Sequence, residues 1–173
     1  MRRYRNARVD GKWRWALFDL DWAFFNDTDS IGNWLTPGGT GAGRRTDNTL
    51  FIACMKNPRF REEFLTYFGE KLATDFSTEN VVSKFEERYA RIEDMLPEYL
   101  EHWGLSLNAG IRKVISYAQE RPAKLLGYFQ NALKLSDADM KKYFGAAIEE
   151  MRESPIWESI EEVAEGILGE GEY

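Results

Sequence analysis

The chain has 173 residues, 43% of them hydrophobic and 30% charged, which is enough to form one compact domain with a sizeable core. A single Cys and a single His exclude an internal disulfide and a structural zinc site. No apolar run approaches the ~20 residues of a transmembrane helix, and no apolar segment follows the basic N-terminus. The sequence therefore predicts neither a membrane span nor a signal peptide.

Charge is distributed unevenly along the chain, whose net charge is −6. Residues 1–16 carry six basic side chains and one acidic one, whereas residues 149–173 carry nine Glu and one Arg. The basic N-terminal stretch could face a phosphate group, but a solvated strand face is the favoured interpretation. The pattern matches no known type of nucleic-acid-binding surface, so no nucleic-acid partner is predicted.

The first predicted element is a β-hairpin. Residues 4–9 and 12–18 have strand-like composition and flank the dipeptide Asp10-Gly11. Asp-Gly is a strong signal for a two-residue type I′ turn, because both of its central positions need a positive φ. Such a hairpin would deliver the residues that follow position 18 at its exit.

Two carboxylates, Asp19 and Asp21, follow the predicted hairpin at once. Protein kinases present a metal-binding Asp to the phosphates of the nucleotide, so the pair is a candidate half of a phosphotransfer site. The alternative is that both are ordinary turn residues bonding nearby amides, and the Asp-x-Asp spacing alone favours this reading. The apolar neighbours Phe18, Leu20 and Trp22 favour a bound cation, because two ionised carboxylates are costly in such surroundings.

Residues 26–47 are predicted to be an irregular loop, because their centre is rich in Gly. This segment lacks the Lys-Ser/Thr ending of a phosphate-binding P-loop. Beyond it, apolar residues recur at helical spacing. His102, near Trp103, is expected to be a surface or packing residue rather than a general base.

The helical region is divided by capping residues and prolines. Pro97 is interpreted as a break or kink after a long helix that begins at Ser77. The predicted helix starts are, in order, Asp47, Asn57-Pro58, Ser77, Asn108, Arg121-Pro122 and Ser136. The predicted fold is mainly α, a short N-terminal hairpin followed by a bundle of about six helices. Its predicted parts are the hairpin (2–18), the acid pair (19–21), the loop (26–47), helices (47–135), and additional helices with an acidic tail (136–173).

Four stretches, taken in order, resemble the CotH kinases, a family named for a bacterial spore coat protein. They are Gly11-Lys12-Trp13-Arg14-Trp15 leading to Asp19-Leu20-Asp21; Asn48-Thr49-Leu50-Phe51; Asn57-Pro58-Arg59-Phe60-Arg61; and Trp103 with Ile111-Arg112 through Glu120-Arg121-Pro122. The resemblance covers residues 1 to about 135, and residues 136–173 carry no family feature. It implies a fold like the C-terminal lobe of an atypical protein kinase.

The resemblance also implies an activity, the transfer of phosphate from ATP to Ser of coat or surface proteins with magnesium or manganese. Asp19 matches the acid that replaces the metal-binding Asp of Asp-Phe-Gly, and Asp21 matches the second acid of that motif. In the family, the ATP-gripping lobe and the catalytic-loop Asp precede this motif, so no catalytic or nucleotide-binding residue is assigned here. We therefore expect the 173 residues alone to show no appreciable kinase activity.

The alternative function is a non-catalytic interaction module of a spore-coat or cell-surface protein, in which the acid pair is vestigial. The resemblance implies a location in the spore coat, the cytoplasm of the sporulating cell or the cell surface. Without a covering lobe, Trp13, Trp15 and Phe18 would form an apolar patch. We therefore expect weak homodimerisation at high concentration, because the net charge still opposes precipitation.

Overall fold

The computed structural model describes residues 2–16, 24, 28–38, 40–41, 44–45 and 48–153. Its helices are α1 (Ser30–Leu35), α2 (Thr49–Met55), α3 (Pro58–Ala73), α4 (Thr78–Tyr89), α5 (Leu96–Trp103), α6 (Leu107–Leu133) and α7 (Asp137–Glu153), with one 3-10 turn, η1 (Glu93–Met95). Its strands are β1 (Arg2–Arg5), β2 (Trp13–Ala16), β3 (Thr40–Gly41) and β4 (Arg44–Arg45). The predicted fold class, mainly α with a short N-terminal hairpin, is confirmed.

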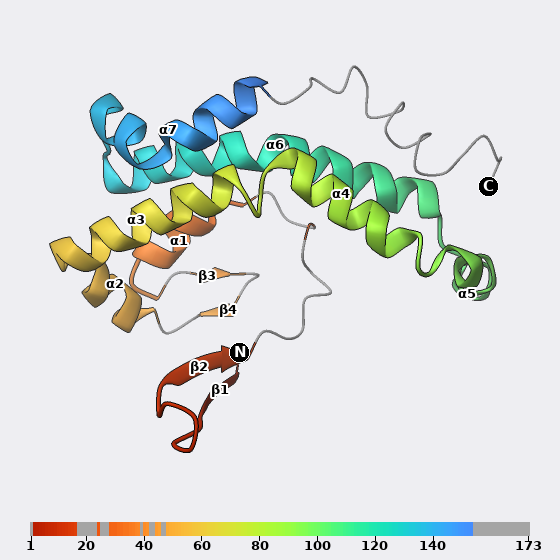
Figure 1. Cartoon of the computed structure of the whole chain (residues 1–173), viewed down its shortest axis with the longest axis horizontal. Helices are drawn as coiled ribbons and strands as arrows, with labels where there is room; N and C mark the ends of the chain where they lie inside the picture. The colour runs from red at the N-terminus through yellow and green to blue at the C-terminus, as the bar shows by residue number, and fades with distance from the viewer. Residues whose placement is uncertain are drawn as a thin grey trace.

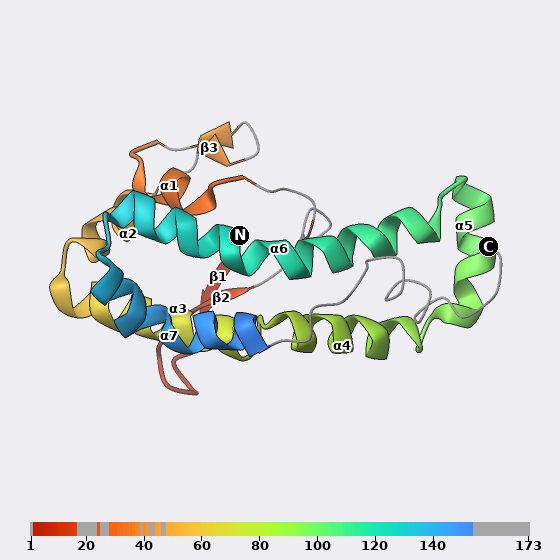
Figure 2. The ribbon, with the colours of Figure 1, turned by 90° about the horizontal axis from the view of Figure 1, so that it is seen from above.

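The long helix α6 is the axis of the molecule (Figure 1). At one end α3, α7 and α1 pack together with the second half of α6, and at the other end α4 runs alongside its first half. Helix α5 lies at the far tip of the α4–α6 pair (Figure 2). We call α4, η1, α5 and the first half of α6 the arm. The β1–β2 hairpin lies apart from the helices.

The main core lies where α1, α3, α6 and α7 meet. Its buried members are Ile31, Leu65, Phe129, Leu135, Met140 and Phe144. Phe129 has no exposed surface and contacts Phe68 edge to face, with ring centroids 4.7 Å apart. A second core, in the arm, consists of Val82, Ile111, Ile115 and Ala118. Because α6 contributes to both cores, it joins the two ends of the molecule.

Helix α6 continues through Pro122, which corrects the prediction that Arg121-Pro122 starts a new helix. A proline has no N–H, so the carbonyl of Ala118, four residues earlier, loses its helical donor. The hydroxyl of Thr78, at the start of α4, donates to this carbonyl oxygen at 3.0 Å in a buried setting. The Thr78 side chain therefore replaces the missing backbone donor, which sequence periodicity alone could not indicate.

We expect Thr78→Val to lower the free energy of unfolding by about 1–3 kcal/mol, because the buried Ala118 carbonyl would be left without its side-chain donor. The matched control is Thr74→Val, since the Thr74 hydroxyl donates to the Glu70 carbonyl at an exposed position. Urea unfolding followed by circular dichroism measures both. Equal losses in the two variants would show that the Thr78 hydrogen bond has no special role.

The hairpin is confirmed, but its turn differs from the prediction. β1 and β2 pair with Tyr4 opposite Arg14 and Arg5 opposite Trp13, so residues 6–12 form a longer loop. The Asn6 carbonyl accepts from the amides of Val9, Asp10 and Gly11. Gly11 has φ +66°, but Asp10 does not enter the left-handed region, so the type I′ turn is absent.

The segment 26–47, expected to be a loop, contains α1 and the two-residue strands β3 and β4, which pair with each other. Asp29 caps α1 by accepting from the Gly32 amide at 2.7 Å. Ile31 is 2% exposed in the main core, and Leu35 packs against that core. Six residues give little helical periodicity, so α1 depends on its packing against α6.

Several helix starts match their predictions because their signals are local. The Asn57 side chain accepts from the amides of Arg59 and Phe60, and the Ser77 hydroxyl accepts from the Asn80 amide. Pro97 instead lies in the first turn of α5, and the helix capped by Ser77 ends at Tyr89. Across the part of the chain that the structure describes, no helix is long and apolar enough to cross a membrane.

Candidate functional site

The two predicted metal ligands, Asp19 and Asp21, lie outside the described residues. The structure describes β2, the strand that precedes the acid pair, and the chain from Thr28, which follows it. Between the acid pair and Thr28 it also describes Phe24. The described residues that flank the acid pair therefore define the candidate site.

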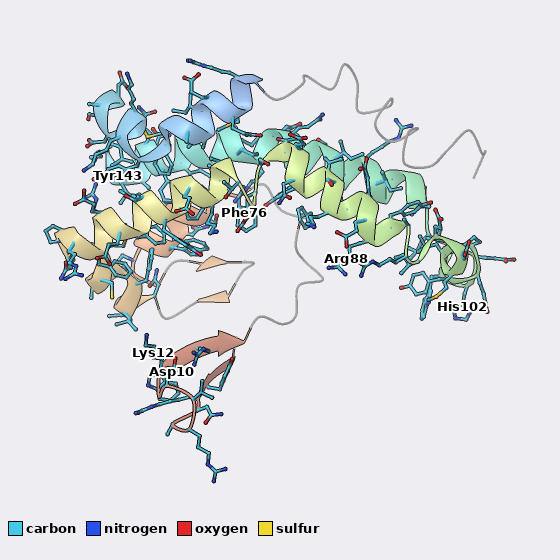
Figure 3. All side chains as sticks on the ribbon, in the orientation of Figure 1. Asp10, Lys12, Phe76, Arg88, His102 and Tyr143 are labelled. Atoms are coloured by element: carbon cyan, nitrogen blue, oxygen red, sulfur yellow. The ribbon has the colours of Figure 1, made fainter. Side chains whose placement is uncertain are left out.

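Upstream of the acid pair, the hairpin is closed by an ion pair. Arg14 donates to both carboxylate oxygens of Asp10, at 2.8 and 2.6 Å, and the Lys12 amide donates to one of them at 3.0 Å. These contacts, the Arg14 bond foremost, hold the pKa of Asp10 below its ordinary value. The Asp10 oxygens therefore bond within the hairpin, whose loop carries both Asp10 and Lys12 (Figure 3).

Downstream of the acid pair, Arg121 of α6 ties the chain to the helices. One guanidinium nitrogen of Arg121 donates to the Thr28 carbonyl at 3.1 Å, and the other donates to the Ser30 hydroxyl at 2.9 Å. The guanidinium also lies over two aromatic rings, 5.6 Å from the centroid of Tyr117 and 5.5 Å from that of Tyr128. The planar fork of Arg suits this combination of two bonds and two ring contacts, which a Lys could not reproduce.

Phe24, which lies between the acid pair and Thr28 in the sequence, also packs against α6. Its ring meets that of Tyr117 edge to face with centroids 5.3 Å apart, and its backbone has φ +59°. A left-handed φ is uncommon for a bulky residue. Next to it lies a mostly apolar cavity of about 350 Å³ between α1, α3 and α6, with Arg121 at its wall.

Asn48, the first residue of a family-like stretch, has a structural role. It is 8% exposed, and its side-chain amide lies within hydrogen-bond distance of three carbonyl oxygens at the end of α1. These belong to Asn33 (3.2 Å), Trp34 (2.9 Å) and Thr36 (2.7 Å). Asn48 therefore joins the C-terminal end of α1 to the start of α2, and with Arg121 it anchors both ends of α1.

Among the described residues, other chemistry-bearing side chains do not gather at a site. No group of three or more His, Cys, Asp or Glu residues able to hold a metal occurs within the described ranges. His102 is exposed on α5, at the far end of the arm (Figure 3). Cys54 is partly buried in α2.

Sequence reasoning missed the anchoring role of Arg121 and its two partners, Thr28 and Ser30. Arg121 is 91 residues from Ser30 and 93 from Thr28, so no local pattern links them. The sequence offered two separate signals: Asp29-Ser30, which marks a helix start, and Arg121, a basic residue on an apolar helix face. Neither signal indicates that Ser30 and Arg121 contact each other.

Comparison with known protein families gives a match. The model of the family described as CotH kinase protein matches residues 2–125, which includes the hairpin, the acid pair, Asn48 and Arg121. A search of curated proteins and a search of solved structures each found no match to the chain. Because the family model covers more than half of the sequence, the chain belongs to the CotH kinase protein family.

Proposed function

We propose that this chain supplies the metal-binding acids of a protein kinase site, which transfers phosphate from ATP to Ser of coat or surface proteins. The family match across residues 2–125 is the observation that carries this proposal. Asp19 and Asp21 are the residues that would hold magnesium or manganese, whose preferred ligands include carboxylate oxygens. When bound, the metal would neutralise charge on the transferring phosphoryl group.

The contribution of the helices is to position these acids. Phosphoryl transfer depends almost entirely on positioning and electrostatics. A metal-binding carboxylate displaced by about one ångström therefore loses much of its contribution to the rate. Arg121 donates hydrogen bonds to Thr28, seven residues after Asp21, and to Ser30. Phe24, closer still to the acids, packs on Tyr117. Both contacts are made by α6, the helix that contributes buried residues to both cores.

Metal binding tests the proposal directly. Titrating Mn²⁺ and following its free electron paramagnetic resonance signal should show one site, and Asp19→Asn should weaken it by about tenfold or more, equivalent to about 1.4 kcal/mol. The matched control is Asp94→Asn, an exposed acid in η1, which should leave the affinity unchanged. Equal affinity in the Asp19→Asn variant and the unaltered protein would contradict the assignment of Asp19.

Catalysis is tested separately, with labelled ATP and a Ser-rich peptide as acceptor. We expect the 173 residues alone to transfer no appreciable phosphate, because no residue that grips the nucleotide is assigned in them. Robust transfer that is abolished by Asp19→Asn would show that this expectation is wrong. It would at the same time support Asp19 as a metal ligand.

A second function, that of a non-catalytic interaction module, is favoured by one observation. The arm ends in several exposed apolar side chains, among them Tyr99 (55% exposed) and Trp103 (61% exposed). Large aromatic groups are enriched where proteins bind one another. Absence of any Mn²⁺ site in the unaltered protein would favour this function over phosphotransfer.

A further inference from the structure

The tip of the arm is both apolar and acidic. Met95, Tyr99, Trp103 and Leu105 are each more than half exposed. Residues 92–106 also contain four acids, Glu93, Asp94, Glu98 and Glu101, and no Lys or Arg. None of these acids forms an ion pair within the described part of the chain. We call this surface the acidic tip.

The hairpin has the complementary character. Tyr4, Val9 and Trp13 are 52%, 69% and 65% exposed. Arg5, Arg8 and Lys12 are exposed and make no ion pair with any residue that the structure describes. Arg5 is paired with Trp13 across the two strands, so the two side chains share one face of the hairpin. We call this surface the basic hairpin.

The two surfaces lie well apart within one copy. The hairpin lies toward the end of the molecule that holds α1, α2 and α3, whereas α5 is at the opposite end, at the tip of the arm (Figures 1 and 2). Because the two surfaces do not meet within one copy, neither covers the exposed apolar side chains of the other. Exposed apolar surface of this kind often marks a site where another molecule binds. Their opposite charges would also steer two copies together.

We propose that the basic hairpin of one copy binds the acidic tip of a second copy. Trp13 would pack against Tyr99 and Trp103, while Arg5, Arg8 and Lys12 would face the four acids. Because the two surfaces differ, the contact is heterologous, so it builds open chains or closed rings rather than only symmetric dimers. This proposal does not depend on phosphotransfer, and it assigns the acidic tip of a second copy as the surface that covers the exposed hairpin.

Charge reversal combined with sedimentation velocity over a concentration series tests the contact. The hairpin variant is Arg5→Glu with Lys12→Glu, and the tip variant is Glu98→Lys with Glu101→Lys. Each reversal places like charges opposite one another, so each variant alone should self-associate about tenfold more weakly than the unaltered chain. Raising the salt concentration to 0.5 M should weaken association of the unaltered chain through screening. All four positions are exposed, so circular dichroism should show unchanged helix content.

Mixing the two variants gives the decisive result. The hairpin variant keeps an intact acidic tip and the tip variant keeps an intact basic hairpin, so the mixture should associate more strongly than either variant alone. A tip variant that still self-associates as strongly as the unaltered chain would overturn the proposal, because the hairpin would then bind another surface. An unaltered chain that is monomeric at every concentration would overturn it as well.

Discussion

Replacing Gly69 with Ala should lower the free energy of unfolding by about 2–3 kcal/mol, one of the largest effects of any single methyl group in this chain. Gly69 is buried in α3, where it faces α7. A Cβ there would overlap the carbonyl oxygen of Tyr143, a backbone atom that no change of rotamer can move. The two helices would have to separate, which would loosen the packing of Leu65 and Phe144 in the main core.

The control for this prediction is Gly127→Ala in α6, where a Cβ would meet no atom within 4 Å. Ala is favoured over Gly inside a helix, so this variant should gain about 0.5–1 kcal/mol. Urea unfolding measures both variants, and for a chain of this size the Gly69→Ala change should lower Tm by about 5–10 °C. If both variants gained stability, α3 and α7 would not be in close contact at Gly69.

The sequence predicts what depends on neighbours along the chain. The helix starts at Asn57-Pro58 and Ser77 are marked by side chains that bond amides two or three residues later. Ser136 is similar, because its hydroxyl accepts from the Asp139 amide while Asp139 accepts from the Ser136 amide and hydroxyl. Such reciprocal caps need no tertiary information, so the mainly helical fold could be predicted.

Features that depend on distant residues could not be predicted in this way. Local rules place Pro122 at the start of a helix, yet α6 runs through it, and the Thr78 hydroxyl, 40 residues from Ala118, supplies the missing donor. The helix α1 is too short to be periodic and is held by Asn48 and Arg121. In each case a tertiary contact overrides the local preference.

The same distinction applies to the stretches that resemble the family. Asn57 caps α3, and Asn48 clamps the end of α1, so these motif residues maintain the scaffold. Arg121 is different, because it connects the scaffold to the segment that carries the acids.

Arg121 is therefore expected to affect both stability and metal binding. Arg121→Lys keeps the positive charge but loses the fork that reaches Thr28 and Ser30 together, at a cost of about 1–3 kcal/mol. Mn²⁺ affinity, measured where the variant is fully folded, should fall by about tenfold, because the chain that follows Asp21 would lose its anchor. Ser30→Ala removes one of the two bonds and should have a smaller effect on both quantities.

The control for Arg121 is Lys124→Gln, one turn further along α6. Lys124 bonds Glu120 at 2.6 Å within the same helix. Losing an exposed pair of this kind costs little, so stability should change by less than about 1 kcal/mol and Mn²⁺ affinity should not change. If Arg121→Lys lowers stability but leaves Mn²⁺ affinity intact, Arg121 supports the fold alone. A loss of affinity in the folded variant, absent from Lys124→Gln, would instead identify Arg121 as the residue that positions the acid pair.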